Sequence, residues 1–242
     1  MFEDYYICFF DLMGQKEFFA AITSDVLGKG IGHDVERVTS GIKEMVKYVN
    51  NRYSKWFSVE DKAGIEIFSD SLLIYVKNSE AVARKIGLWL GMLVKLIFIA
   101  CRYKLPVRGG ITLGRAYRSE HGSIYGLAVE EAMELESEYA DYPRIVLANK
   151  LDKLVAENDI WRKFFRHDVD SSMILNYACR KLLSQPEFQR ERVSLVEIEQ
   201  WVEEQYKHFC FWGDDEHDKY ACPKLARRYV MWLDYLSRIS RT

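Results

Sequence analysis

No pair of cysteines in this chain has the CxxC spacing of a zinc site or a redox motif. The 242 residues contain five cysteines, which are scattered: Cys8, Cys101, Cys179, Cys210 and Cys222. An odd number of isolated cysteines does not fit a disulfide framework, and it lacks the clustered ligands of structural zinc. We therefore expect reduced thiols and a cytoplasmic protein.

The chain also lacks an excess of positive charge. Lys and Arg total 34 against 36 Asp and Glu, so the formal net charge is -2, and we expect no affinity for nucleic acid or for an acidic membrane. The opening MFEDYYICFF contains no basic residue, unlike a secretory signal. The apolar stretch 86–103 is interrupted by Lys95, which favours a buried helix over a membrane span.

Internal repeats and low-complexity tracts are absent as well, so the length suits one large domain, or a domain with an appendage. Residues 1–150 show the pattern strand, helix, two strands, helix, strand, helix, strand, and the first helical region extends from about Gln15 to Tyr53. This order predicts an α+β fold with a ferredoxin-like βαββαβ core. Residues 151–242 predict a further hairpin and a helical extension that packs on the core.

Within that pattern, "FSDSLLIYV" places Asp70 inside an apolar run, and Asp11 stands at the end of the first strand. In a βαββαβ core these two carboxylates would lie near each other at one edge of the sheet. Two such groups repel unless a divalent cation lies between them, and Mg²⁺ and Mn²⁺ prefer oxygen ligands. The alternative reading is that Asp70 is an ordinary turn residue and Asp11 a helix N-cap.

Four motifs in order resemble the class III nucleotidyl cyclases: "FFDLMGQKEF", "IEIFSDSLLIYV", "VRGGITLGRAY" and "GSIYGLAVEEAMELE". The resemblance implies two divalent ions, Mn²⁺ or Mg²⁺, bound by Asp11, Asp70 and the Leu12 carbonyl. It also implies that Arg115 contacts the triphosphate, and that Leu12 and Gly14 lie against the substrate.

The similarity covers roughly Tyr5–Ala148, and within the family the spelling resembles bacterial pyrimidine cyclases of Pycsar anti-phage systems. This implies an enzyme that makes cyclic UMP or cyclic CMP, a second messenger for a downstream effector. It also implies a head-to-tail homodimer with shared active sites.

The helix after the glycine-rich strand departs from the family pattern. Where the relatives carry an asparagine and an arginine, this chain has Glu130 and Glu134, which cannot neutralise a developing phosphate charge. Either another cation acts there, with Arg108, Arg118 and Arg144 as candidates, or the protein is a catalytically degenerate nucleotide-binding signalling protein.

The base-reading positions depart as well. They hold Glu66 and Ser123, a pair that is guanylate-like at the first position only. A carboxylate suits the N3–H of uracil better than the unprotonated N3 of cytosine, so we expect UTP first and CTP next, with a guanylate or adenylate cyclase as the alternative. We expect these positions to lie too far from Asp11 and Asp70 on one core to share a substrate, which also favours a dimer.

Overall fold

The structure is a computed structural model that describes residues 1–12, 31–178, 184, 189–210 and 223–240. The chain divides into two compact units, Met1–Asn176 and Tyr177–Thr242. Each unit is described by itself.

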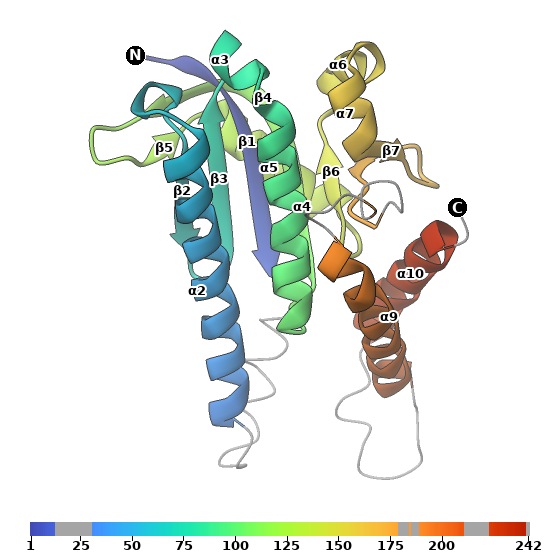
Figure 1. The fold of residues 1–242 in the computed structure, drawn as a ribbon. Coiled ribbons are helices and arrows are strands. Elements are labelled where there is room, and N and C mark those ends of the chain that lie inside the picture. Colours follow the sequence, from blue (N-terminus) through green and yellow to red (C-terminus); the bar gives the residue numbers. More distant parts are fainter. Residues whose placement is uncertain (13–30, 179–183, 185–188, 211–222, 241–242) are drawn as a thin grey trace. The chain divides into compact units, whose positions relative to one another are not determined.

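The first unit is built on a mixed sheet flanked by helices (Figure 1). Its strands are β1 (Glu3–Leu12), β2 (Gly64–Phe68), β3 (Ser71–Lys77), β4 (Val107–Arg118), β5 (Ile124–Tyr125), β6 (Ile145–Leu147), β7 (Phe165–His167) and β8 (Met173–Leu175). Its helices are α2 (Ile31–Trp56), α3 (Glu80–Ala83), α4 (Ile86–Arg102), α5 (Leu127–Glu134), α6 (Asp152–Glu157) and α7 (Asp159–Phe164). One π-helical turn, Leu135–Tyr139, continues α5, and short 3₁₀ turns lie at Val59–Asp61 and Asn149–Leu151.

The strand order confirms the expected fold class. The sheet runs β2-β3-β1-β4-β6-β8-β7, with β5 paired to β4. Within the series β2-β3-β1-β4, neighbouring strands are antiparallel, which is the arrangement of a ferredoxin-like βαββαβ core. Strand β6 then joins β4 in parallel after the α5 crossover. The part of the predicted first helix at residues 15–30 lies outside the described residues.

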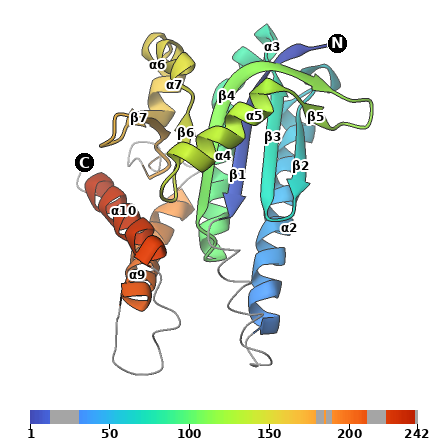
Figure 2. The ribbon, with the colours of Figure 1, turned by 180° about the vertical axis from the view of Figure 1, so that it is seen from behind.

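Strand β1 is buried on both faces because helices cover both sides of the sheet (Figures 1 and 2). Its even-numbered residues face α2 and α4, as the contact between Tyr6 and Trp89 of α4 shows. Its odd-numbered residues pack with Ala128 and Ala132 of α5. Successive side chains point to opposite faces, so Asp11, which is odd-numbered, belongs to the α5 face.

Helix α5 lies against β4 because two glycines leave room for it. A Cβ at Gly110 would stand 2.3 Å from the Ala132 carbonyl oxygen and 2.5 Å from Cβ of Leu135. A Cβ at Gly114 would stand 3.2 Å from that of Ala128. The glycines of the "VRGGITLGRAY" strand therefore permit close packing between a helix and a sheet, as expected.

The expected hairpin after residue 150 is present and belongs to the first unit. Strands β7 and β8 pair antiparallel, and β8 continues the sheet from β6. The boundary between the compact units thus falls after Asn176, whereas the sequence suggested a division at residue 150.

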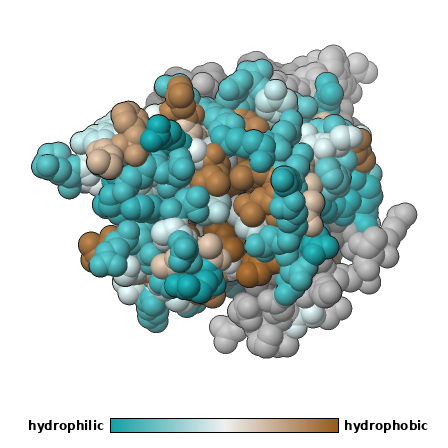
Figure 3. All heavy atoms as spheres, turned by 90° about the horizontal axis from the view of Figure 1, so that it is seen from above, coloured by the Kyte–Doolittle hydropathy of each residue, from teal (hydrophilic) through white to brown (hydrophobic). Residues whose placement is uncertain are grey.

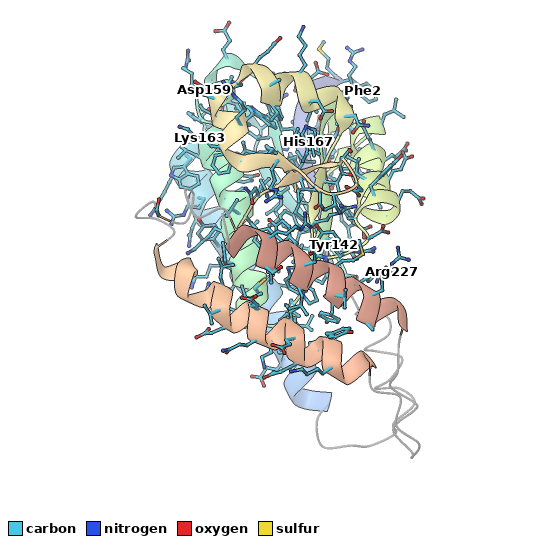
Figure 4. All side chains as sticks on the ribbon, turned by 90° about the vertical axis from the view of Figure 1, so that its right-hand side faces the viewer. Phe2, Tyr142, Asp159, Lys163, His167 and Arg227 are labelled. Carbon is cyan, nitrogen blue, oxygen red and sulfur yellow. The ribbon has the colours of Figure 1, made fainter. Side chains whose placement is uncertain are left out.

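A buried ion cluster ties this hairpin to the loop before β6. Arg144, 2 % exposed, contacts Asp168 at 2.8 Å and Asp170 at 2.6 Å. Tyr142, labelled in Figure 4, donates its hydroxyl hydrogen to Asp168.

The second unit contains α9 (Gln189–Cys210) and α10 (Pro223–Ser240). The two helices pack through aromatic side chains, including an edge-on contact between Trp201 and Trp232. The indole N–H of Trp232 donates to the hydroxyl of Tyr177 at 2.6 Å. A helical C-terminal extension was expected.

None of the helices in the described ranges is long and apolar enough to span a membrane. The apolar stretch at 86–103 forms α4, most of which is buried, as predicted. Hydrophilic residues cover most of the face seen in Figure 3, with a group of hydrophobic residues near its centre.

Candidate functional site

Asp11 lies at the end of β1, between two strands. Its register partners are Ser71 on β3 and Arg108 on β4. The Ser71 hydroxyl donates to Oδ1 at 2.9 Å, and Nη2 of Arg108 donates to Oδ2 at 3.4 Å. The side chain is 23 % exposed, so this carboxylate is held in place while it remains reachable from solvent.

Asp70 occupies the two-residue turn between β2 and β3, directly before Ser71. The turn is possible because Ser69 adopts a left-handed conformation with φ of 57°. The apolar hairpin tolerates Asp70 because this residue lies in the turn and is partly exposed to solvent. The turn also places Asp70 beside Asp11, whose pKa its charge raises.

Leu12 and Gly14 are the other two residues near this end of β1 that are predicted to lie against the substrate. Leu12 is the last residue of β1, pairs with Val107 and is 2 % exposed. Gly14 lies outside the described residues, so its predicted contact with substrate stays a prediction.

The electrostatics at Asp11 suit a cation. Burial raises the pKa of Asp11, and the charge of Asp70 raises it further, whereas the Ser71 hydrogen bond and the Arg108 charge lower it. The net direction is upward, so the chain alone does not fully stabilise the ionised carboxylate. Carboxylate and carbonyl oxygens are the ligands that Mg²⁺ and Mn²⁺ take, so Asp11, Asp70 and the Leu12 carbonyl fit such an ion. The described residues contain no cluster of three or more His, Cys, Asp or Glu side chains suited to a metal, so water and substrate oxygens would complete the coordination.

The predicted base-reading residues lie together in one chain. Glu66 on β2 accepts a hydrogen bond at 2.5 Å from the backbone N–H of Ile124, the residue after Ser123. Burial raises the pKa of Glu66, while the Ile124 N–H and the charge of Arg118 lower it. Glu66 therefore has one carboxylate oxygen occupied and a guanidinium nearby.

Tyr75 holds the loop that carries Ser123. Its ring lies over Gly64, where an added Cβ would stand 2.3 Å from the tyrosine hydroxyl. The hydroxyl donates to the Gly122 carbonyl and accepts from Nε of Arg118 at 3.3 Å. Strands β2, β3 and β4 thus meet the β4–β5 loop in one polar cluster.

The register brings Glu66 closer to Asp11 than the sequence suggested. Glu66 pairs with Leu73, which pairs with Phe9, two residues before Asp11. Two residues along a strand and two strand spacings correspond to roughly 12 Å between the Cα atoms. Both side chains belong to the α5 face. The expectation that these positions lie too far apart to share one substrate is therefore not supported by the register.

Arg115 is not brought to the aspartates within one chain. It pairs with Asp4, seven positions along β4 from the pair of Arg108 and Asp11. Seven residues of a strand span roughly 24 Å, and the alternation puts Arg115 on the opposite face of the sheet. Its predicted contact with the triphosphate stays a prediction that requires another chain or a different strand geometry.

The three candidate cations have different surroundings. Arg144 is buried with Asp168 and Asp170, which removes it as a phosphate contact. Arg118 lies by Tyr75, and Arg108 lies beside the candidate metal ligand.

Sequence reasoning missed the ion pair between Arg108 and Glu136, a buried residue of the π-helical turn after α5. The alternation along β1 and β4 could have placed Arg108 opposite Asp11 only if the register had been known. Glu130 and Glu134, the two acids that depart from the family pattern, are exposed on α5.

No protein-family model and no curated protein matches this chain. Among solved structures, it is similar to a bacterial light-regulated adenylyl cyclase, with 14 % sequence identity and a TM-score of 0.44. The match covers 76 % of this chain and 95 % of the other. A similarity this weak carries no conclusion about activity.

Proposed function

We propose that the chain is a nucleotidyl cyclase that converts UTP, or CTP, to the 3′,5′-cyclic monophosphate and pyrophosphate. The observation that carries the proposal is the meeting of Asp11 and Asp70 at adjacent strand ends, with the pKa of Asp11 raised. Two Mn²⁺ or Mg²⁺ ions there would activate the ribose 3′-hydroxyl for attack on the α-phosphate and steady the leaving pyrophosphate.

The preference for a pyrimidine rests on how Glu66 is used. One carboxylate oxygen already accepts the Ile124 N–H, which leaves the other for a base. Uracil offers a single N3–H, whereas guanine presents N1–H and N2–H side by side and suits a carboxylate with both oxygens available. Arg118 lies close enough to affect the pKa of Glu66 and can donate to a base carbonyl.

The test is incubation with Mn²⁺ and each of the four triphosphates, followed by separation and mass measurement of the products. We expect cyclic UMP as the main product. Cyclic GMP or cyclic AMP as the main product would contradict the pyrimidine preference and keep the cyclase. No cyclic product from any triphosphate would favour the second candidate, a nucleotide-binding signalling protein. The exposed acids Glu130 and Glu134 support this candidate, because they cannot neutralise a developing phosphate charge.

We further propose a head-to-tail homodimer whose product is a second messenger for an anti-phage effector, as the resemblance implies. Arg115 supports a second chain, because it lies far from the aspartates of its own chain. Mixing an Asp70→Ala chain with a Glu66→Ala chain should restore part of the activity if each site uses both chains. Dimers without any restored activity would instead indicate that each chain holds a complete site, which the spacing of Glu66 and Asp11 permits.

A further inference from the structure

In the part of the chain that the structure describes, Arg108 is a cation in contact with a candidate metal ligand, Asp11, and it is shared with a second acid. Its Nη2 contacts Oδ2 of Asp11 at 3.4 Å and forms a closer ion pair with Glu136. Two carboxylates therefore contact one guanidinium, and the charge of a third, Asp70 in the adjacent turn, acts on Asp11. Arg108 therefore cannot neutralise the group by itself.

The two contacts of Arg108 differ in strength. Glu136 is buried, with a side chain 9 % exposed, and its ion pair with Arg108 is short. Asp11 is more exposed, its contact is long, and its other oxygen is held by Ser71. Because opposite charges attract more strongly when they are closer and less exposed to water, Glu136 anchors the guanidinium and Asp11 holds it only weakly. A divalent ion can take Asp11 without breaking the anchor.

We propose that Arg108 is an exchangeable counter-ion: it balances Asp11 in the metal-free chain, yields it to the divalent ion, and then donates to the α-phosphate. This inference rests on the proposed cyclase function. Oxygens bound to one Mg²⁺ or Mn²⁺ ion lie about 3 Å apart, so a phosphate oxygen beside Asp11 is within reach of a guanidinium already 3.4 Å from that carboxylate. Arg108 then supplies the positive charge that Glu130 and Glu134 cannot.

The test measures Mn²⁺ affinity and turnover, which would both fall if Arg108 had a merely structural role. A double variant, Arg108→Met with Glu136→Gln, removes both charges of the ion pair, so Glu136 is not left as an unpaired buried acid. We expect its Mn²⁺ affinity, measured by electron paramagnetic resonance without nucleotide, to rise about fivefold or more, because the positive charge that is lost contacts Asp11, whereas the negative charge that is lost pairs with Arg108. We expect its turnover with UTP to fall about 100-fold, as when one donor to a developing anion is lost.

Two further variants complete the design. Arg108→Lys keeps the charge, so its Mn²⁺ affinity should stay near that of the unchanged chain. Arg166→Met removes an arginine on β7, near the opposite edge of the sheet, and should change neither readout.

Mn²⁺ affinity that is unchanged or weaker in the double variant would overturn the inference while the cyclase proposal stands. Wild-type Mn²⁺ binding that does not depend on Asp70 would overturn the metal site and this inference together.

Discussion

Two clusters of arginine and acidic residues in the first unit differ in how completely the chain stabilises their ionised carboxylates. The hairpin cluster contains Arg144, Asp168 and Asp170, and the Asp11 cluster contains Asp11, Asp70, Arg108 and Glu136. In the hairpin cluster, burial raises the pKa of Asp170, but hydrogen bonds from Arg144 and the Ser172 N–H outweigh it and the net pKa is lowered. At the strand ends, burial outweighs the donors and the net pKa of Asp11 is raised.

The difference indicates a structural role for the hairpin cluster and a chemical role for the Asp11 cluster. In the hairpin cluster the two aspartates are paired with Arg144, and these ion pairs link the β7–β8 turn to the loop before β6. The cluster at Asp11 is incompletely compensated, which is the condition under which a site gains from binding a cation. Both contain an arginine and two aspartates, and they differ in Glu136, the additional acid that pairs with Arg108.

The largest expected effect is the loss of Asp70. Asp70→Ala should lower cyclase turnover by roughly a thousandfold or more, because a divalent ion contributes several kcal/mol to such a transition state. Its melting temperature should not fall, since the change removes a charge that raises the pKa of Asp11. Asp170→Ala, which also removes an aspartate from a hairpin turn, is the matched control and should leave turnover per folded molecule intact. If the Asp70→Ala variant kept the turnover of the unchanged chain, the Asp11 cluster would have no more catalytic role than the hairpin cluster.

Asp168→Ala should show the opposite pattern. It leaves the buried guanidinium of Arg144 with one partner fewer, and breaking a buried ion pair costs about 3–5 kcal/mol of unfolding free energy. Urea unfolding measures the loss, and activity of the protein that remains folded should persist. A change below about 1 kcal/mol would show that the hairpin cluster does not have this structural role.

Gly110→Ala should disturb the support of the Asp11 cluster. The new methyl group would collide with the Ala132 carbonyl and Leu135, so α5 must shift, at a cost of about 1–3 kcal/mol. The control is Gly87→Ala in α4, where the methyl group meets only the side chain of Ile160 at 3.1 Å and helix propensity improves. Thermal unfolding of both variants checks this, and equal stability would argue against tight packing of α5.

The smallest effect is a pH dependence at Asp170. Its pKa is lowered below the ordinary value of 3.8, so its ionised form stabilises the fold above that pH, and this contribution is lost as the pH falls through the lowered pKa. Asp170→Asn should therefore unfold at a lower urea concentration at pH 7, and the difference should vanish in strong acid. If the difference in urea midpoint between the variant and the unchanged chain stayed constant from pH 7 to strong acid, the ion pair with Arg144 would be contradicted.

Much of the core could be predicted because its signals are local. Apolar runs of strand length, glycines in β4 and the turn around Asp70 each act over a few residues, and together they predicted the βαββαβ order. The nearness of Asp11 and Asp70 followed from that order.

Other features depended on contacts between residues far apart in the chain. Arg108, Arg118 and Arg144 were equivalent candidates in the sequence, and only their partners separate them. Glu136 lies 28 positions after Arg108, and nothing in its neighbourhood indicates that it would hold that arginine.

The sequence by itself determined the order of strands and helices, and it placed the two aspartates at strand ends, because hydrophobic periodicity and turn residues act locally. Only the tertiary structure decided that Asp11 shares Arg108 with Glu136, and that Glu66 accepts a hydrogen bond from the residue after Ser123. It also decided that Arg115 lies at the far end of β4 from Asp11. Strand register decides these pairings, since a shift of one residue would move every side chain to the other face of the sheet.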